Sequence, residues 1–145
     1  MASAPREVWG DLATTAFVES SPLFRGLDPE ARGDVLQLAR VVEYAPGEVV
    51  SEEADDAFLL LLDGTAATQA GGLEIAQLER GATFGEGRVL GGGRLVALVA
   101  RTDVAVVAFP APVIAAVAGR FPRMRKLLEA VLAAREREAV AKLGA

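Results

Sequence analysis

The sequence contains no cysteine and no histidine among its 145 residues. Without cysteine there is no disulfide framework and no thiol chemistry. Without histidine the chain lacks the usual general base and the commonest metal ligand. Metal-dependent enzymes that rely on a histidine cluster are therefore excluded. We predict a protein that is not an enzyme, with no catalytic residue, no metal site and no cofactor.

Positive charge and long apolar runs are also scarce. Lysine and arginine number 15 against 20 aspartates and glutamates, and no dense basic patch appears, so generic nucleic-acid binding is not expected. An apolar run such as Ala57 to Leu62 is far too short to span a bilayer. The segment from Met1 to Trp9 carries Glu7 and has no long apolar core, unlike a signal peptide. We expect a cytoplasmic protein without a membrane partner.

The length and a hydrophobic content of 52% indicate one domain with a substantial core. Residues 1–20 are predicted to form an N-terminal helix, with helical spacing from Arg6 to Glu19 that ends at Ser20-Ser21-Pro22. Asp28 is placed to cap a second helix, with Pro29 at its first position.

From Arg40 the pattern changes to short apolar segments separated by turns. The predicted strands are Arg40–Tyr44, a strand that begins at Val49, Phe58–Leu62, Thr65–Gln69, Leu73–Leu78, Leu95–Ala100 and Val104–Phe109. Short strands at such regular spacing are typical of an antiparallel barrel or jelly roll.

Helical patterns return after Pro110. We predict a short helix from Val113 to Ala118, stopped by Gly119, and a long helix from Arg123 to about Leu143. The first half of the long helix should pack on the barrel, and the half after Ala134 should be exposed or meet a partner. Its apolar stripe suggests a homodimer contact through the residues Met124, Leu128, Leu132, Ala139 and Leu143.

The predicted fold class is therefore α+β: an antiparallel β-barrel or jelly roll (a double-stranded β-helix), flanked by N-terminal helices and a long C-terminal helix. The predicted parts are the N-terminal helix at 1–20, the barrel domain at 21–120 and the C-terminal helix at 121–145.

The stretch from Phe84 to Arg94 is the strongest candidate for a binding site. It holds five glycines, one acid and two arginines. A Gly-rich turn that opens into a short helix presents backbone N–H groups to an anion, and Arg94 could clamp that anion. Glu86 is a good acceptor for sugar hydroxyls, so the combination suggests a sugar phosphate. The alternative is a plain Gly-rich hairpin loop with solvated charges.

Several segments occur in an order and spacing similar to one known family. They are Phe24-Arg25-Gly26-Leu27, Pro46-Gly47-Glu48-Val49-Val50, Phe58 to Gly64, Leu78 with Gly81, Phe84-Gly85-Glu86 and Thr102-Asp103-Val104. From about Ser21 to about Arg137 the chain resembles the cyclic nucleotide-binding domain family, which includes the catabolite activator protein, the regulatory subunits of protein kinase A and the cyclic nucleotide-gated channels.

The resemblance implies a ligand and a set of site residues. It implies that Glu86 accepts the ribose 2′-hydroxyl, and that Arg94 pairs with the cyclic phosphate of cyclic AMP or cyclic GMP, helped by amides of a short helix. The expected ligand-binding residues are Gly85, Glu86, Gly87, Arg88, Val89, Arg94, Leu95 and Val96.

The Phe84–Arg94 stretch also departs from the family. Gly87 and Arg88 stand where a large apolar residue and then a small one are usual, and Leu95 and Val96 stand where small or hydroxyl residues are preferred. Val96 should point to the same side as Arg94, where it could narrow the phosphate site. Arg88 could help to fill that site, add a second cation for a more highly charged ligand, or be solvated.

The long helix also bears on base recognition. It carries no Ser, Thr or Asn to hydrogen-bond a base, so purine recognition would rest on apolar contacts such as Val140 or on a partner.

Two functions follow as hypotheses. In the first, the chain is a regulatory sensor domain that binds a cyclic mononucleotide and repositions its C-terminal helix. In the second, it is a degenerate member without ligand that serves as a protein-protein interaction module. A transcription factor would need a helix-turn-helix domain after the long helix. Because the sequence ends at Ala145, we expect no DNA binding by this chain alone.

Overall fold

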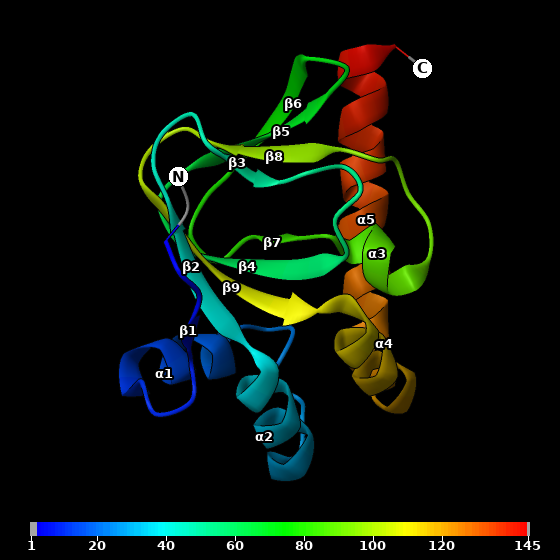
Figure 1. Ribbon diagram of the computed structural model, residues 1–145. Coiled ribbons are helices and arrows are strands. Elements are labelled where there is room, and N and C mark those ends of the chain that lie inside the picture. Colours follow the sequence, from blue (N-terminus) through cyan, green and yellow to red (C-terminus); the bar gives the residue numbers. More distant parts are fainter. Residues whose placement is uncertain (1–2, 145) are drawn as a thin grey trace.

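A computed structural model describes residues 3–144, which form two layers of antiparallel sheet with helices at both ends of the chain (Figure 1). One sheet has the strand order β1-β2-β9-β4-β7, with β1 at Arg6–Glu7, β2 at Arg40–Tyr44, β9 at Val104–Pro110, β4 at Ala57–Asp63 and β7 at Thr83–Phe84. The other has the order β3-β8-β5-β6, with β3 at Val49–Ser51, β8 at Ala97–Ala100, β5 at Ala66–Ala70 and β6 at Leu73–Leu78. This confirms the predicted α+β jelly-roll class.

The predicted strand bounds agree with the structure to within one residue, apart from two larger differences. β8 begins at Ala97 rather than at Leu95, because the first residue of this segment with a ladder partner is Ala97, which lies opposite Gln69. The two-residue strands β1 and β7 were not predicted. They exist through pairing with β2 and β4, and so short a segment carries no period of its own.

The first helix is shorter than predicted. α1 spans Leu12–Ser20, whereas the spacing predicted a helix from Arg6. Asp11 has an extended backbone and its carboxylate accepts a hydrogen bond from the amide of Thr14, so the helix begins there. The predicted helix at 1–20 also included residues 1–2, which lie outside the described residues. α2 spans Pro29–Leu38, and the cap by Asp28 is confirmed, since its carboxylate accepts the Ala31 amide at 2.8 Å.

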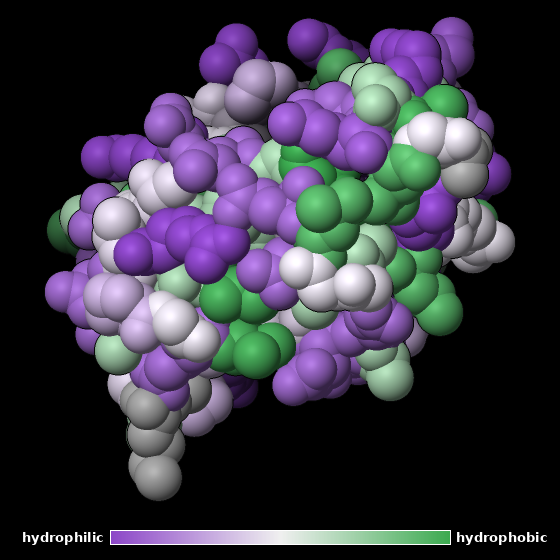
Figure 2. Space-filling model, turned by 90° about the horizontal axis from the view of Figure 1, so that it is seen from above, coloured by the Kyte–Doolittle hydropathy of each residue, from purple (hydrophilic) through white to green (hydrophobic). Residues whose placement is uncertain are grey.

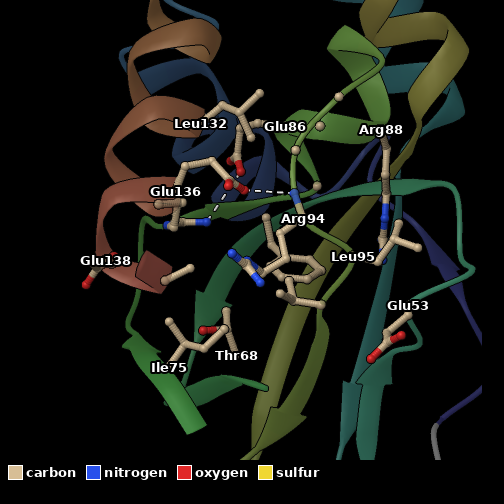
Figure 3. Close-up of a pocket in the computed structure, with 18 of the residues that line it drawn as sticks. Glu53, Thr68, Ile75, Glu86, Arg88, Arg94, Leu95, Leu132, Glu136 and Glu138 are labelled. Atoms are coloured by element: carbon tan, nitrogen blue, oxygen red, sulfur yellow. Dashed lines mark hydrogen bonds and ion pairs between the residues drawn. The ribbon is translucent and has the colours of Figure 1, made fainter. Parts of the chain in front are cut away.

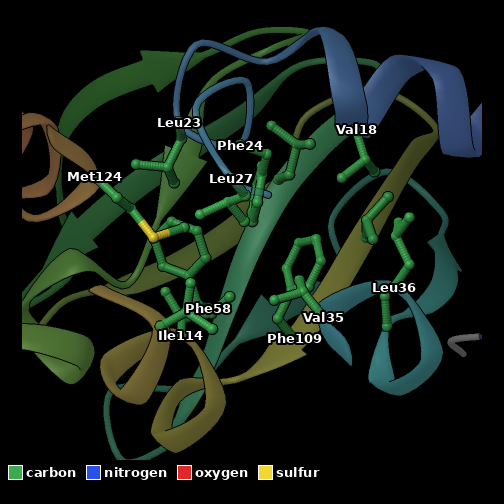
Figure 4. Packing of buried hydrophobic residues seen from close by; sticks show 14 of the residues in the cluster. Val18, Leu23, Phe24, Leu27, Val35, Leu36, Phe58, Phe109, Ile114 and Met124 are labelled. Atoms are coloured by element: carbon green, nitrogen blue, oxygen red, sulfur yellow. The ribbon is translucent and has the colours of Figure 1, made fainter. Parts of the chain in front are cut away.

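Strand β4 is apolar throughout because both of its faces are buried. Phe58 and Leu60 belong to a cluster that the sheet shares with the helices, and Leu59 and Leu61 belong to the cluster between the sheets. In the first cluster the ring of Phe109 lies 5.1 Å from that of Phe24 and 6.4 Å from that of Phe58 (Figure 4). Such aromatic pairs contribute about 0.5–1.5 kcal/mol beyond their burial.

The C-terminal helices bring the end of the chain back over the sheets. α4 spans Ala111–Arg120, so Gly119 does not stop it as predicted, and α5 spans Pro122–Leu143. Gly119 lies inside a helix that other residues hold against the core, and a single glycine costs about 1 kcal/mol there. Of the predicted C-terminal helix at 121–145, residue 145 lies outside the described residues.

The second half of α5 is exposed over much of its surface, as predicted, but one side of it packs against the rest of the chain. Figure 1 shows α5 running past α3 (Glu86–Leu90) toward the β5–β6 hairpin. Ala139, near its end, is as buried as Met124 and Leu128 near its start. The face that suggested a homodimer is therefore largely covered within this chain. Among residues 3–144, no helix combines the length and the apolar character needed to cross a membrane.

Candidate ligand pocket

A cavity of about 310 Å³ lies between the Gly-rich stretch, the β5–β6 hairpin and α5 (Figure 3). This volume is at the lower end of the range for small-molecule sites, about 300–1,000 Å³. Of the residues predicted to bind ligand, those that line it are Gly85, Glu86, Gly87, Arg88, Arg94, Leu95 and Val96. Val89 is not part of the lining; its side chain packs against the helix-side core.

The Gly-rich stretch is a short helix rather than a plain hairpin loop. α3 begins after Gly85, whose φ of 99° is the left-handed conformation that favours glycine. It ends where the carbonyl of Gly87 accepts the amides of Gly91 at 2.8 Å and Gly92 at 2.9 Å. A Cβ on Gly87 would come within 2.0 Å of the Gly92 carbonyl oxygen. Backbone packing therefore requires glycine at this position.

Glu86 is a buried carboxylate with two partners. It is 3% exposed, its Oε2 accepts the hydroxyl of Thr83 at 2.5 Å, and its Oε1 lies 3.3 Å from Nη1 of Arg135. Arg135 also donates through Nη2 to the carbonyl of Thr83 at 2.7 Å. Buried charges are stable when paired in this way. A carboxylate has about four lone-pair positions, so Glu86 retains acceptor capacity toward the cavity.

Arg88 binds the loop opposite the Gly-rich stretch. Its Nη1 donates to the hydroxyl of Ser51 at 2.8 Å and to the carbonyl of Ala57 at 3.0 Å, and its Nη2 donates to the carbonyl of Glu52 at 2.8 Å. The guanidinium also lies over the ring of Phe84. Burial lowers the pKa of Arg88, and nearby carboxylates act in the opposite direction. The side chain is therefore not plainly solvated, and its hydrogen bonds join α3 to residues 51–57.

Arg94 and its neighbours form the rim of the cavity. The backbone N–H of Arg94 donates to Oε1 of Glu136 at 2.8 Å, and its guanidinium points into the cavity (Figure 3). Leu95 is 69% exposed, whereas Val96 is half-buried and packs against the cluster between the sheets. Both Arg94 and Val96 line the cavity, consistent with the side predicted for Val96.

The sequence reasoning missed the wall that α5 contributes. The missed lining residues are Leu132, Arg135, Glu136, Glu138 and Ala139 from α5, together with Glu53, Thr68, Ile75 and Ala76. Helical spacing from the buried Leu128 would have found the face that carries Leu132, Arg135 and Ala139. Val140, expected to make apolar contacts to a base, is not in the lining and is 47% exposed.

Known proteins share both the sequence pattern and the fold. No protein-family model matches the chain. The cAMP-dependent protein kinase regulatory subunit of Hypocrea atroviridis is 31% identical over 93 residues, which are 62% of this chain and 20% of that protein. The catabolite activator protein of Thermus thermophilus is 32% identical, with a TM-score of 0.63 over 86% of this chain and 62% of that chain. In sequence pattern and in fold, this chain resembles the cyclic nucleotide-binding domain family.

The fold is shared more widely than the sequence. The structure of cAMP-bound PfPKA-R is 21% identical to this chain, with a TM-score of 0.75 over 90% of this chain and 46% of that chain. This cyclic nucleotide-binding-like domain spans about a fifth of its curated relative and about half of PfPKA-R. The similar proteins are regulatory subunits and an activator rather than enzymes, in agreement with the prediction for this chain.

Proposed function

We propose that this chain is a regulatory domain that binds cyclic AMP or cyclic GMP in the α3–α5 cavity and repositions α5 in response. The observation that carries the proposal is that Glu86 and Arg94 line one cavity from the two ends of the Gly-rich stretch. The names of similar proteins support it, since they include a cAMP-dependent regulatory subunit and a cAMP-bound structure.

The lining offers a partner for each part of such a ligand. The guanidinium of Arg94 suits a cyclic phosphate, and the remaining lone pairs of Glu86 suit a ribose hydroxyl. Leu132, Ile75 and Ala139 supply an apolar surface for a base. Because α5 contributes two of these three residues and also binds Glu86, a ligand that fills the cavity acts directly on α5.

A second function is a domain without ligand that serves as a protein-protein interaction module. Contacts within the chain favour it, since Arg135 already pairs with Glu86 and Glu136 already accepts the Arg94 amide. Apolar side chains also lie exposed near the cavity, with Leu73 on β6 50% exposed and Val140 on α5 47% exposed. Figure 2 shows this end of the molecule from above, with hydrophobic residues gathered between hydrophilic ones.

Calorimetric titration with cyclic AMP and cyclic GMP tests the first proposal. Removing one partner of a charge-assisted pair costs about 2–5 kcal/mol. Arg94→Leu should therefore weaken binding at least about tenfold. Glu86→Gln should reduce the binding affinity by a smaller factor. It should also reduce the ratio of the affinities for ribose and 2′-deoxyribose nucleotides, since an amide oxygen is a weaker hydrogen-bond acceptor than a carboxylate oxygen.

Val96→Ala separates the two functions. If Val96 only crowds the cavity, trimming it should tighten binding or create it. If calorimetry detects no heat of binding for either nucleotide at millimolar concentration, with the wild type or with Val96→Ala, the interaction module is the better description.

A cytoplasmic location and a homodimer through α5 stay predictions. The dimer would need residues that the chain leaves exposed, such as Val140.

A further inference from the structure

Consecutive residues of α5 bind the Gly-rich stretch at both of its ends. Arg135 pairs with Glu86 at the start of α3, and Glu136 accepts the backbone N–H of Arg94 at the end of the stretch. One turn earlier, Leu132 lies so near Gly93 that a Cβ there would come within 2.8 Å of its Cδ1 atom. The second half of α5 is therefore fastened to the segment that carries Arg94, and Figure 3 shows both polar contacts as dashed lines.

The two polar contacts differ in what they leave for a ligand. Glu86 has lone pairs beyond those used by Thr83 and Arg135, so a ribose hydroxyl can be added without breaking either contact. A backbone N–H has one hydrogen to donate. The Arg94 amide can therefore donate its hydrogen bond either to Glu136 or to an incoming anion, but not to both.

We infer that Glu136 is an internal anion that competes with the ligand's phosphate at Arg94 and thereby holds α5 against the ligand-free pocket. Carboxylates and phosphates are both anions that accept hydrogen bonds from backbone N–H donors. The carboxylate of Glu136 and a phosphate also carry charge of the same sign, so they repel each other. The inference rests on the proposed function and deepens it: a phosphate that pairs with the Arg94 guanidinium and also accepts the Arg94 backbone N–H displaces Glu136 and releases this part of α5.

This competition predicts that removal of Glu136 tightens binding. Glu136→Ala should bind the preferred cyclic nucleotide about tenfold more tightly than the wild type, the scale of a lost charge-assisted hydrogen bond. Glu136→Gln should show a smaller gain, since its amide oxygen can still accept the Arg94 N–H. Glu129→Gln is the matched control: it removes the same charge from α5 at an exposed site that pairs with Arg125, away from the cavity.

A second probe keeps the inference separate from nucleotide recognition. Inorganic phosphate is titrated into each variant while the NMR shift of the Arg94 amide is followed. The chemical shift of the Arg94 amide should change at a lower phosphate concentration in Glu136→Ala than in the wild type or in Glu129→Gln. In the ligand-free proteins, hydrogen exchange of the Arg94 amide should be faster in Glu136→Ala than in the wild type or in Glu129→Gln. This result would confirm that the hydrogen bond between the Arg94 N–H and Glu136 exists in solution.

The outcomes separate the two proposals. If no variant binds a nucleotide but phosphate reaches the Arg94 amide more readily in Glu136→Ala, the proposed function fails and the competition stands. If Glu136→Ala matches the wild type with both nucleotide and phosphate, or binds them more weakly, the competition is wrong whether or not the protein binds cyclic nucleotides.

Discussion

The side chains of Glu86 and Arg135 lie 49 residues apart in the sequence and meet at 3.3 Å in the structure. Glu86 is 3% exposed and Arg135 is 22% exposed, so the pair is mostly shielded from water. This contact joins α3 to the second half of α5 and makes the long helix a wall of the cavity.

Breaking this pair from one side should destabilise the protein. Arg135→Leu leaves a buried carboxylate without its cation, at a cost of about 3 kcal/mol in the free energy of unfolding, the lower end for buried pairs because Arg135 is partly exposed. The double variant Glu86→Gln with Arg135→Leu should lose less than the sum of the single variants. Chemical denaturation measures all three. Arg137→Leu, at an exposed position of the same helix, should stay within about 0.5 kcal/mol. Strict additivity would show that the two side chains do not interact in solution.

One position of the Gly-rich stretch requires glycine, whereas another position can accept alanine. A Cβ on Gly87 would overlap the carbonyl oxygen of Gly92, whereas a Cβ on Gly92 meets nothing within 4 Å. Gly87→Ala should lower the free energy of unfolding by about 1–3 kcal/mol, as overpacking does. Gly92→Ala should change it by about 0.5 kcal/mol at most. Equal thermal denaturation midpoints for the two variants would contradict the backbone path of α3.

Arg88 should act on the stability of the loop at 51–57 more than on ligand affinity. Arg88→Met keeps an apolar stem over Phe84 but removes the hydrogen bonds to Ser51, Glu52 and Ala57. We expect a loss of about 2 kcal/mol in the free energy of unfolding and faster amide exchange in this loop. A loss of nucleotide affinity as large as that of Arg94→Leu, with stability unchanged, would instead make Arg88 the second phosphate cation.

The cap at the start of α1 should make stability depend on pH. Hydrogen bonds from the Thr14 hydroxyl and amide hold the pKa of Asp11 below its ordinary value of 3.8. A carboxyl whose pKa is lower in the folded state stabilises the fold above its unfolded pKa, and this contribution is lost as the pH falls through the folded pKa. Asp11→Asn keeps a capping side chain without the charge. The difference in melting temperature between wild type and Asp11→Asn should therefore shrink as the pH falls below 3.8. A difference that stays constant over this range would mean that the charge of Asp11 does not contribute.

Local patterns were sufficient for most of the fold. The alternation of short apolar runs with turns placed every strand long enough to show a period, and the Asp28-Pro29 pair placed the start of α2. The Gly-rich stretch also identified one side of the cavity, because Glu86 and Arg94 belong to a single short segment whose chemistry is readable by itself. The family resemblance added the order of the segments to these local signals.

What the sequence determined by itself was thus the set of longer strands, the capped second helix and the Glu86–Arg94 side of the site. Only the tertiary structure decided the other side. By hydropathy, Arg135 and Glu136 belong to a solvated helix end. Their spacing in the sequence does not indicate that Arg135 contacts Glu86, 49 residues earlier, or that Glu136 contacts Arg94, 42 residues earlier. The same holds for β1, whose two residues form a strand only because β2 offers them hydrogen bonds. Polar contacts between distant segments leave no period in the sequence, because charge attracts across space rather than along the chain.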